Sequence, residues 1–269
     1  MIWLEILILA TVQGIAEFLP ISSSGHIVVG AAVCDQVGQP IDEKLTVNVV
    51  LHLGTLVAIL VFYWRRIGLL MSEDRRVIGL LIVGSVPAAI FGFVVKGTEF
   101  GGVLEGALES PLLAGLMFPV TGAMLIWTAR RESGQTTCRQ LGYGQALVIG
   151  VFQAFAILPG VSRSGATIVA ALGCGLRRDE AATFSFLLAI PAIGGAGLLE
   201  LRDLIVAPTG HTPLGALAAG AVVSFLVGLL SLRWLIRWLQ RGRLHWFAWW
   251  VIPLGLAVVA WRLFAPGPV

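Results

Sequence analysis

The chain has 269 residues, of which 57% are hydrophobic and only 12% are charged, and its mean hydropathy is +0.91. A soluble domain carries roughly 25% charged residues, so this composition excludes a soluble globular protein and predicts an integral membrane protein. The net charge of +3 does not indicate nucleic-acid binding, because the arginines form short clusters beside apolar segments. No cleaved signal peptide is expected, since the N-terminus lacks basic residues, and the three cysteines have no metal-ligand or redox spacing and are assigned to packing.

Residues 1–33 contain two short apolar stretches that are separated by a polar break at 20–25. Neither stretch reaches the roughly 20 residues that a spanning helix needs, so a re-entrant pair of helices is predicted. Gln13 and Glu17 would share one face of the first helix, and Pro20 would end it. The serines after Pro20 would begin a second helix, whose free N–H groups attract anions.

Longer apolar stretches follow and are separated by polar loops, among them 34–45 and 96–110. They predict six transmembrane helices, at about 46–64, 77–95, 111–129, 181–203, 214–236 and 246–264. A second broken segment, at about 141–176, lies between the third and the fourth. Basic loops tend to stay in the cytoplasm, and every loop agrees when the arginine-rich ones are placed there, at 65–76, 130–139 and 237–243. Both termini are then external, and the first break opens towards the outside.

The second break repeats the first at an offset of 140 residues. Five polar or small residues recur, pairing Gln13 with Gln153, Ala16 with Ala156, Ser22 with Ser162, Ser24 with Ser164 and Gly25 with Gly165. The pattern predicts one membrane domain built from inverted-topology repeats, about 1–130 and 141–269, with a ligand site at their interface. The copies differ where Glu17, Ser23 and His26 give way to Ile157, Arg163 and Ala166. One half would supply proton and nucleophile chemistry, and the other a fixed positive charge.

Ionisable side chains at membrane depth are costly and are therefore candidates for function. A carboxylate at Glu17, a hydroxyl or imidazole nucleophile at Ser23 or His26, and an arginine at Arg163 are the parts that phosphoryl transfer needs. A substrate with an apolar tail and a phosphate head would suit such a site. His52 has no charged neighbour in sequence and is assigned to helix packing.

Three motifs in order, at 13–26, 159–167 and 184–191, strongly resemble those of undecaprenyl-diphosphate phosphatases of the bacitracin-resistance type. The resemblance covers essentially the whole chain. It implies an enzyme of the bacterial inner membrane that removes the terminal phosphate of undecaprenyl diphosphate and so recycles the lipid carrier for peptidoglycan synthesis. It also implies bacitracin resistance and a divalent cation, usually Mg²⁺, as activator.

Carried onto this sequence, the resemblance implies a catalytic set and a diphosphate-binding set. The catalytic set is Glu17, Ser23, His26 and Arg163, and the binding set is Gln13, Ser22, Ser24, Gly25, Ser162, Ser164, Gly165 and Thr167. Glu17 is the expected metal ligand, because position 13 is Gln here where many members carry Glu. Ser23 would attack the distal phosphorus with His26 as base or orienting partner. Attack by His26 itself is the alternative, and the sequence leaves both open.

Two other classes of function compete with this one. Inverted repeats with broken helices are typical of transporters, so a polyprenyl-phosphate flippase is the main alternative. An inert scaffold in an envelope-synthesis complex is the second, and it leaves the buried polar groups unexplained. A carrier needs the arginine but not the set of Glu17, Ser23 and His26, which favours catalysis. Bilayer lipids are the expected surroundings, and the oligomeric state stays open, with a homodimer as one option.

Overall fold

The computed structural model describes residues 2–36, 44–98, 100–129, 133–206 and 212–264, and within these ranges the regular secondary structure is helical. The only isolated β-bridge in the same ranges joins Thr136 and Leu176. The predicted all-α class is therefore confirmed.

The helices agree closely with the predicted elements. The largest difference at the end of a predicted span is four residues, at the end of α11 (predicted 236, observed Gln240). In chain order the helices are α1 (Ile2–Ala16), α2 (Ser23–Gln36), α3 (Lys44–Phe62), α4 (Trp64–Ser72), α5 (Arg75–Gly97), α6 (Phe100–Leu108), α7 (Pro111–Ala129), η1 (Cys138–Gln140), α8 (Tyr143–Phe155), α9 (Arg163–Gly173), α10 (Arg178–Val206), α11 (Leu214–Gln240), η2 (Leu244–Phe247) and α12 (Ala248–Phe264).

Several of these helices are long and apolar enough to cross a bilayer. In the described part of the chain there are five such segments, and a sixth if α3 and α4 count as one span despite the 66° bend between them. The chain is therefore a multi-pass membrane protein, while the count of six spans stays a prediction. The apolar helices α1 and α8 are shorter, as predicted for the two broken segments.

Two helices lie where the sequence analysis expected only loops. α4 occupies most of the basic stretch 65–76, and α6 occupies the acidic stretch 96–110. A spanning helix needs about 20 apolar residues, and helices of nine residues are too short to produce that signal in the sequence. Each of them packs on α5, and α4 buries Leu70.

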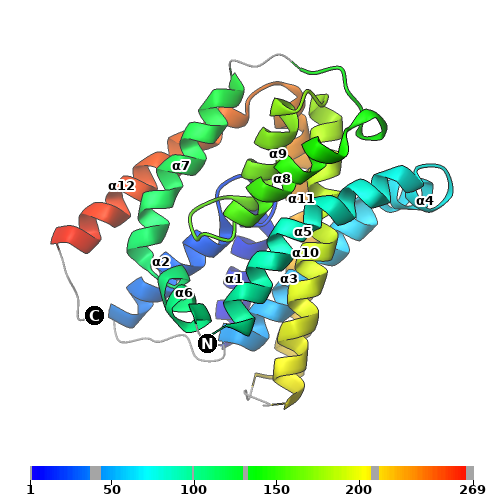
Figure 1. Cartoon of the computed structure of the whole chain (residues 1–269). Coiled ribbons are helices and arrows are strands. Elements are labelled where there is room, and N and C mark those ends of the chain that lie inside the picture. Colours follow the sequence, from blue (N-terminus) through cyan, green and yellow to red (C-terminus); the bar gives the residue numbers. More distant parts are fainter. Residues whose placement is uncertain (1, 37–43, 99, 130–132, 207–211, 265–269) are drawn as a thin grey trace.

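The first helix of each broken segment packs against a long helix from the other half of the chain. α1 lies on α11, and α8 lies on α5 (Figure 1). Glycines allow both close approaches: a Cβ at Gly14 would lie 2.9 Å from the Ser224 carbonyl oxygen, and one at Gly150 would lie 2.2 Å from that of Gly84. This exchange of partners agrees with the predicted inverted repeat, which stays a prediction.

The basic loops that were predicted to share one face of the membrane do lie together. Arg66 pairs with Asp74 at 3.0 Å and with Glu180 at 3.8 Å, and Arg139 from the following loop also pairs with Asp74. Asp74 is buried beneath these arginines. The turn after α4, the segment before α8 and the start of α10 therefore form one polar end of the helical bundle.

The two breaks meet in the middle of the bundle, far from that end (Figure 1). The contact is close because glycine occupies both sides of it: a Cβ at Gly25 would lie 2.7 Å from the backbone nitrogen of Gly160. Gly160 has a φ of +89°, a conformation that glycine adopts without strain. The fold thus brings the starts of α2 and α9 together inside the helical bundle.

Candidate active site

Ser22 stabilises the backbone of the first break and links the first break to the second by a hydrogen bond. Its hydroxyl oxygen accepts hydrogen bonds from the backbone N–H of Gly25 at 3.3 Å and from that of Gly160 at 3.1 Å. Its own φ is +68°, which is uncommon for a residue with a side chain and is maintained here by those contacts. Ser22, predicted to bind the diphosphate, therefore acts as a cap for α2 and as a link between the halves.

The second break repeats this arrangement. The Ser162 hydroxyl caps α9 by accepting from the N–H of Gly165 at 3.1 Å. Thr121 of α7 supports the turn from outside, because its hydroxyl donates to the Gly160 carbonyl at 2.7 Å and accepts from the Ser162 N–H at 3.0 Å. Two capped helix starts therefore face each other, and each presents the positive end of its dipole.

Glu17 lies in the turn after α1, with its side chain only 7% exposed. Its Oε1 accepts from Arg163 Nη2 at 2.6 Å, and its Oε2 accepts from Gln13 Nε2 at 3.1 Å and from the Ser23 hydroxyl at 3.2 Å. Gln13 and Glu17 share a helix face, as predicted. A buried carboxylate is thus surrounded by donors from α1, α2 and α9, and the Ser23 proton points at it.

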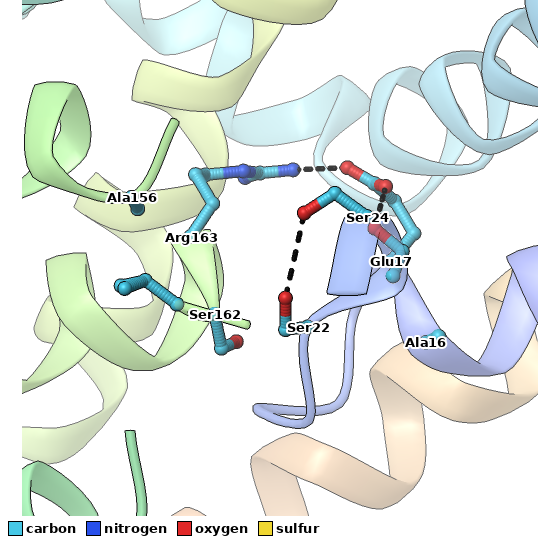
Figure 2. A pocket seen from close by; sticks show the side chains of 9 residues that line it. Ala16, Glu17, Ser22, Ser24, Ala156, Ser162 and Arg163 are labelled. Carbon is cyan, nitrogen blue, oxygen red and sulfur yellow. Dashed lines mark hydrogen bonds and ion pairs between the residues drawn. The ribbon is translucent and has the colours of Figure 1, made fainter. Parts of the chain in front are cut away.

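Arg163 is the first residue of α9 and reaches across to Glu17, as Figure 2 shows. One of its terminal nitrogens, Nη2, makes the ion pair, whereas Nη1 is buried and has no hydrogen-bond partner in the described structure. An unpaired buried guanidinium nitrogen is costly unless a ligand occupies it. This half of the guanidinium is therefore available to an anion such as a phosphate.

A small cavity of about 40 Å³ lies between the two breaks. Its wall combines the polar groups just described with apolar residues from the ends of α1 and α8, and it is lined by Ala16, Glu17, Ser22, Ser23, Ser24, Ala156, Val161, Ser162 and Arg163. Figure 2 places the serines of the first break opposite Ser162 and Arg163 of the second. The cavity can receive a phosphate-sized group between a hydroxyl, a guanidinium and two helix starts.

His26 does not join this group. Its Nδ1 donates to the Ser22 carbonyl at 2.7 Å, which leaves Nε2 as an acceptor, and Nε2 accepts from Trp250 Nε1 of α12 at 3.0 Å. The ring also packs edge-on against Phe118. The predicted pairing of His26 with Ser23 is therefore not formed in this structure, and a catalytic role for His26 stays a prediction.

The remaining predicted binding residues contact the protein itself. The Thr167 hydroxyl donates to the Arg163 carbonyl at 2.8 Å and lies 2.6 Å from the Ser185 hydroxyl of α10. The Ser164 hydroxyl oxygen lies 3.2 Å from the Ser162 hydroxyl oxygen, and the Ser24 hydroxyl oxygen lies 3.4 Å from the Ser22 hydroxyl oxygen. The two glycines of the predicted diphosphate-binding set, Gly25 and Gly165, are buried where the two breaks approach each other.

His52 of α3, which the sequence pattern assigned to helix packing, is a neighbour of the site. Its Nε2 lies 3.7 Å from Glu17 Oε2. The pattern around His52 gave no warning, because Glu17 is 35 positions away in sequence and lies on a separate helical segment. The one available signal was that an ionisable group inside a predicted span is a functional candidate by default.

The role of Glu17 as a metal ligand stays a prediction. Both of its oxygens are already engaged by donors, and the described residues contain no cluster of three or more His, Cys, Asp or Glu that could hold a metal ion. Gln13 offers a different oxygen, because its Oε1 is buried and has no partner in the described structure. Mg²⁺ commonly keeps several waters and binds chiefly to substrate phosphates, so one protein oxygen beside a diphosphate fits that ion.

Known proteins are similar to this chain over most of its length. Residues 6–257 match the family described as bacitracin resistance protein BacA. A protein named undecaprenyl-diphosphatase from Rhodopirellula baltica is 51% identical over 261 residues, covering 97% of this chain and 98% of its own. Relatives from Methanosphaera stadtmanae (undecaprenyl-diphosphatase, 36% identical) and Bacillus thuringiensis (undecaprenyl-diphosphatase 4, 37% identical) cover 95% and 96% of this chain and 96% of their own lengths. On these matches, the chain belongs to the BacA family of bacitracin resistance proteins.

Proposed function

We propose that the chain is an undecaprenyl-diphosphate phosphatase, which hydrolyses undecaprenyl diphosphate to undecaprenyl phosphate and inorganic phosphate. The names of its relatives support this activity. The observation that carries it is the Ser23 hydroxyl, which donates to the buried Glu17 carboxylate beside a guanidinium with one unpaired nitrogen. The product is the lipid carrier of peptidoglycan synthesis. The reaction also depletes undecaprenyl diphosphate, and this depletion accounts for bacitracin resistance.

In the proposed mechanism Ser23 is the nucleophile. Its proton passes to Glu17 as Oγ bonds to the terminal phosphorus, and the P–O bond to the bridging oxygen breaks, so that undecaprenyl phosphate leaves with that electron pair. Water then attacks the phosphorus of the phosphoserine, loses one proton to solvent, and the bond between phosphorus and Ser23 Oγ breaks to release phosphate. Ser23 Oγ takes the proton held by Glu17, which restores the carboxylate. Glu17 suits this role because its Oε2 already lies 3.2 Å from the Ser23 hydroxyl.

Arg163 and the helix starts would stabilise the charge that the reaction moves. Arg163 Nη1 would bind a terminal phosphate oxygen while Nη2 remains on Glu17. The backbone N–H groups at the starts of α2 and α9 add dipoles that favour an anion between them. Positioning and charge neutralisation of this kind supply most of the catalysis in phosphoryl transfer.

An apolar groove beside the site supports a lipid substrate. It has a volume of about 470 Å³ and lies between α7, α8 and α9, lined by Ala123, Met124, Trp127, Val148, Phe152, Val169, Ala170, Gly173 and Cys174. Met124 and Phe152 also pack on the cluster that contains Ala156 and Val161, which line the polar cavity. An apolar chain whose head lies in the cavity could follow this continuous surface.

A divalent cation would be held mainly by the diphosphate itself and by water, with Gln13 Oε1 as the protein ligand. Bound there, it would neutralise part of the diphosphate charge. Addition of a chelator should therefore lower phosphate release, and Gln13→Leu should weaken the dependence on added Mg²⁺ without abolishing activity.

We place the protein in the bacterial inner membrane with its site open to the external face, because the basic loops then lie in the cytoplasm. The orientation can be tested by labelling single cysteines introduced into a variant that lacks the three native cysteines. Ser24→Cys should react with an impermeant maleimide added outside intact cells, whereas Ser133→Cys, in the opposite loop, should react only after permeabilisation. The reverse labelling pattern would overturn the orientation.

Phosphate release from undecaprenyl diphosphate by the purified chain in detergent tests the activity itself. Hydrolysis needs no sealed membrane, whereas lipid flipping does, so release in detergent separates the enzyme from the flippase. Wild-type protein that is folded and still releases no phosphate at any Mg²⁺ concentration would refute the proposal.

A further inference from the structure

The His52 ring has a fixed orientation in which one nitrogen faces the carboxylate of the site. Its Nδ1 lies 2.9 Å from the Asn48 carbonyl oxygen, one helical turn earlier. A carbonyl oxygen only accepts hydrogen bonds, so Nδ1 carries a proton, and in the neutral form of the ring Nε2 has a lone pair. That lone pair faces Glu17 Oε2 at 3.7 Å.

This separation is too long for a hydrogen bond in the resting state, and two lone pairs would face each other across it. The situation changes when Glu17 takes up a proton from Ser23, because the carboxylic acid then becomes a donor. The other close neighbours of Oε2 are donors already, namely Gln13 Nε2 and the Ser23 hydroxyl. His52 Nε2 is the one acceptor among the described contacts of this oxygen.

α3 is fixed firmly enough to hold the ring there. The Ser224 hydroxyl of α11 donates to the Leu51 carbonyl at 2.8 Å, and Gly54 lies so close to α11 that a Cβ would be 2.6 Å from the Ala221 carbonyl oxygen. The Thr55 hydroxyl donates to the carbonyl of His52 at 2.8 Å. These contacts fix the backbone of α3 beside the site, and a small rotation of the two side chains would close the 3.7 Å separation to hydrogen-bond length.

We propose that His52 is a positioning residue for the reaction, and this inference rests on the proposed phosphatase function. His52 Nε2 accepts a hydrogen bond from the Glu17 carboxylic acid that forms when Ser23 gives up its proton. The bond holds the transferred proton away from the departing phosphate and keeps Glu17 oriented for its return to Ser23. His52 does not contact the substrate, so its effect falls on turnover and not on binding.

Two substitutions separate this role from packing. His52→Leu replaces the ring with an apolar side chain of similar size that has no hydrogen-bond acceptor. His52→Gln provides an acceptor oxygen at a similar distance from the backbone. We expect His52→Leu to lower kcat for phosphate release by about 10- to 100-fold, which corresponds to the loss of one hydrogen bond to a buried group. KM should stay within about 2-fold, and His52→Gln should recover most of the lost kcat.

Ser224→Ala is the matched control, because it loosens α3 from α11 without touching Glu17. It should lower the melting temperature and leave kcat within about 2-fold of wild type. The inference is overturned if His52→Leu and His52→Gln lose kcat equally, if both keep the wild-type kcat, or if neither of them folds. Each of these outcomes leaves phosphate release by the wild type unaffected. No phosphate release by the wild type would instead refute the function on which the inference rests.

Discussion

Arg163→Ala should reduce phosphate release from undecaprenyl diphosphate by more than about 1,000-fold. Arg163 is the only described cation that lines the cavity, and its Nη1 is the unpaired donor there. Arg163→Lys should remain about 100-fold below wild type, because an ammonium group cannot pair with Glu17 and a phosphate oxygen in the same forked geometry. Steady-state phosphate release with saturating Mg²⁺ measures both variants.

A stability measurement separates this loss of chemistry from a loss of structure. Arg163→Ala leaves the buried Glu17 carboxylate without its ion pair, which should destabilise the fold by about 3 kcal/mol. The double variant Arg163→Met with Glu17→Gln contains no buried charge at this position and should melt near the wild-type temperature while remaining inactive. Recovery of activity in the double variant would mean that the ion pair serves the fold alone.

Ser23→Ala should abolish turnover, with a loss of at least about 1,000-fold, and should leave the melting temperature almost unchanged. The Ser23 side chain makes a single described hydrogen bond, to Glu17, so its removal disturbs little of the structure. The matched control is Ser85→Ala, which removes a hydroxyl that bonds only to the Leu81 carbonyl of its own helix. This control should keep full activity.

The covalent intermediate decides between the two nucleophiles. Quenching the reaction with labelled substrate should trap acid-stable phosphate on Ser23. A phosphohistidine at His26 is the rival outcome, and it would require Nε2 to leave its hydrogen bond with Trp250. Trp250→Phe would then accelerate formation of the intermediate, whereas the serine mechanism expects no such increase.

The general plan of the fold could be read from the sequence because strong local signals mark it. Pro20 and the serines after it predicted the first break, and the repeat of the same pattern around Ser162 predicted the second. The helices start and end there as capping chemistry requires. The sequence also predicted that the two breaks meet at one interface, but the ion pair between Glu17 and Arg163 appears only in the structure.

The contacts of the two histidines could not be predicted in the same way. His26 meets Trp250 across 224 positions, and His52 meets Glu17 through the packing of α3. Such contacts depend on how helices rotate about their axes and on which helix covers which. Motifs and hydrophobic periodicity contain no information about either. The motif placed His26 beside the serines along the chain, and the start of α2 turned its ring towards α12 instead.

The ion pair between Glu17 and Arg163 also constrains the order in which the protein can be made. The two residues are 146 positions apart, so Glu17 enters the membrane long before its partner has been synthesised. An unpaired carboxylate at mid-depth costs about 3 kcal/mol on insertion scales. The ion pair can offset this cost only once α9, which begins with Arg163, has been synthesised. The active site can therefore be complete only after the second break has been made, although α10, α11 and α12 still follow it in the chain.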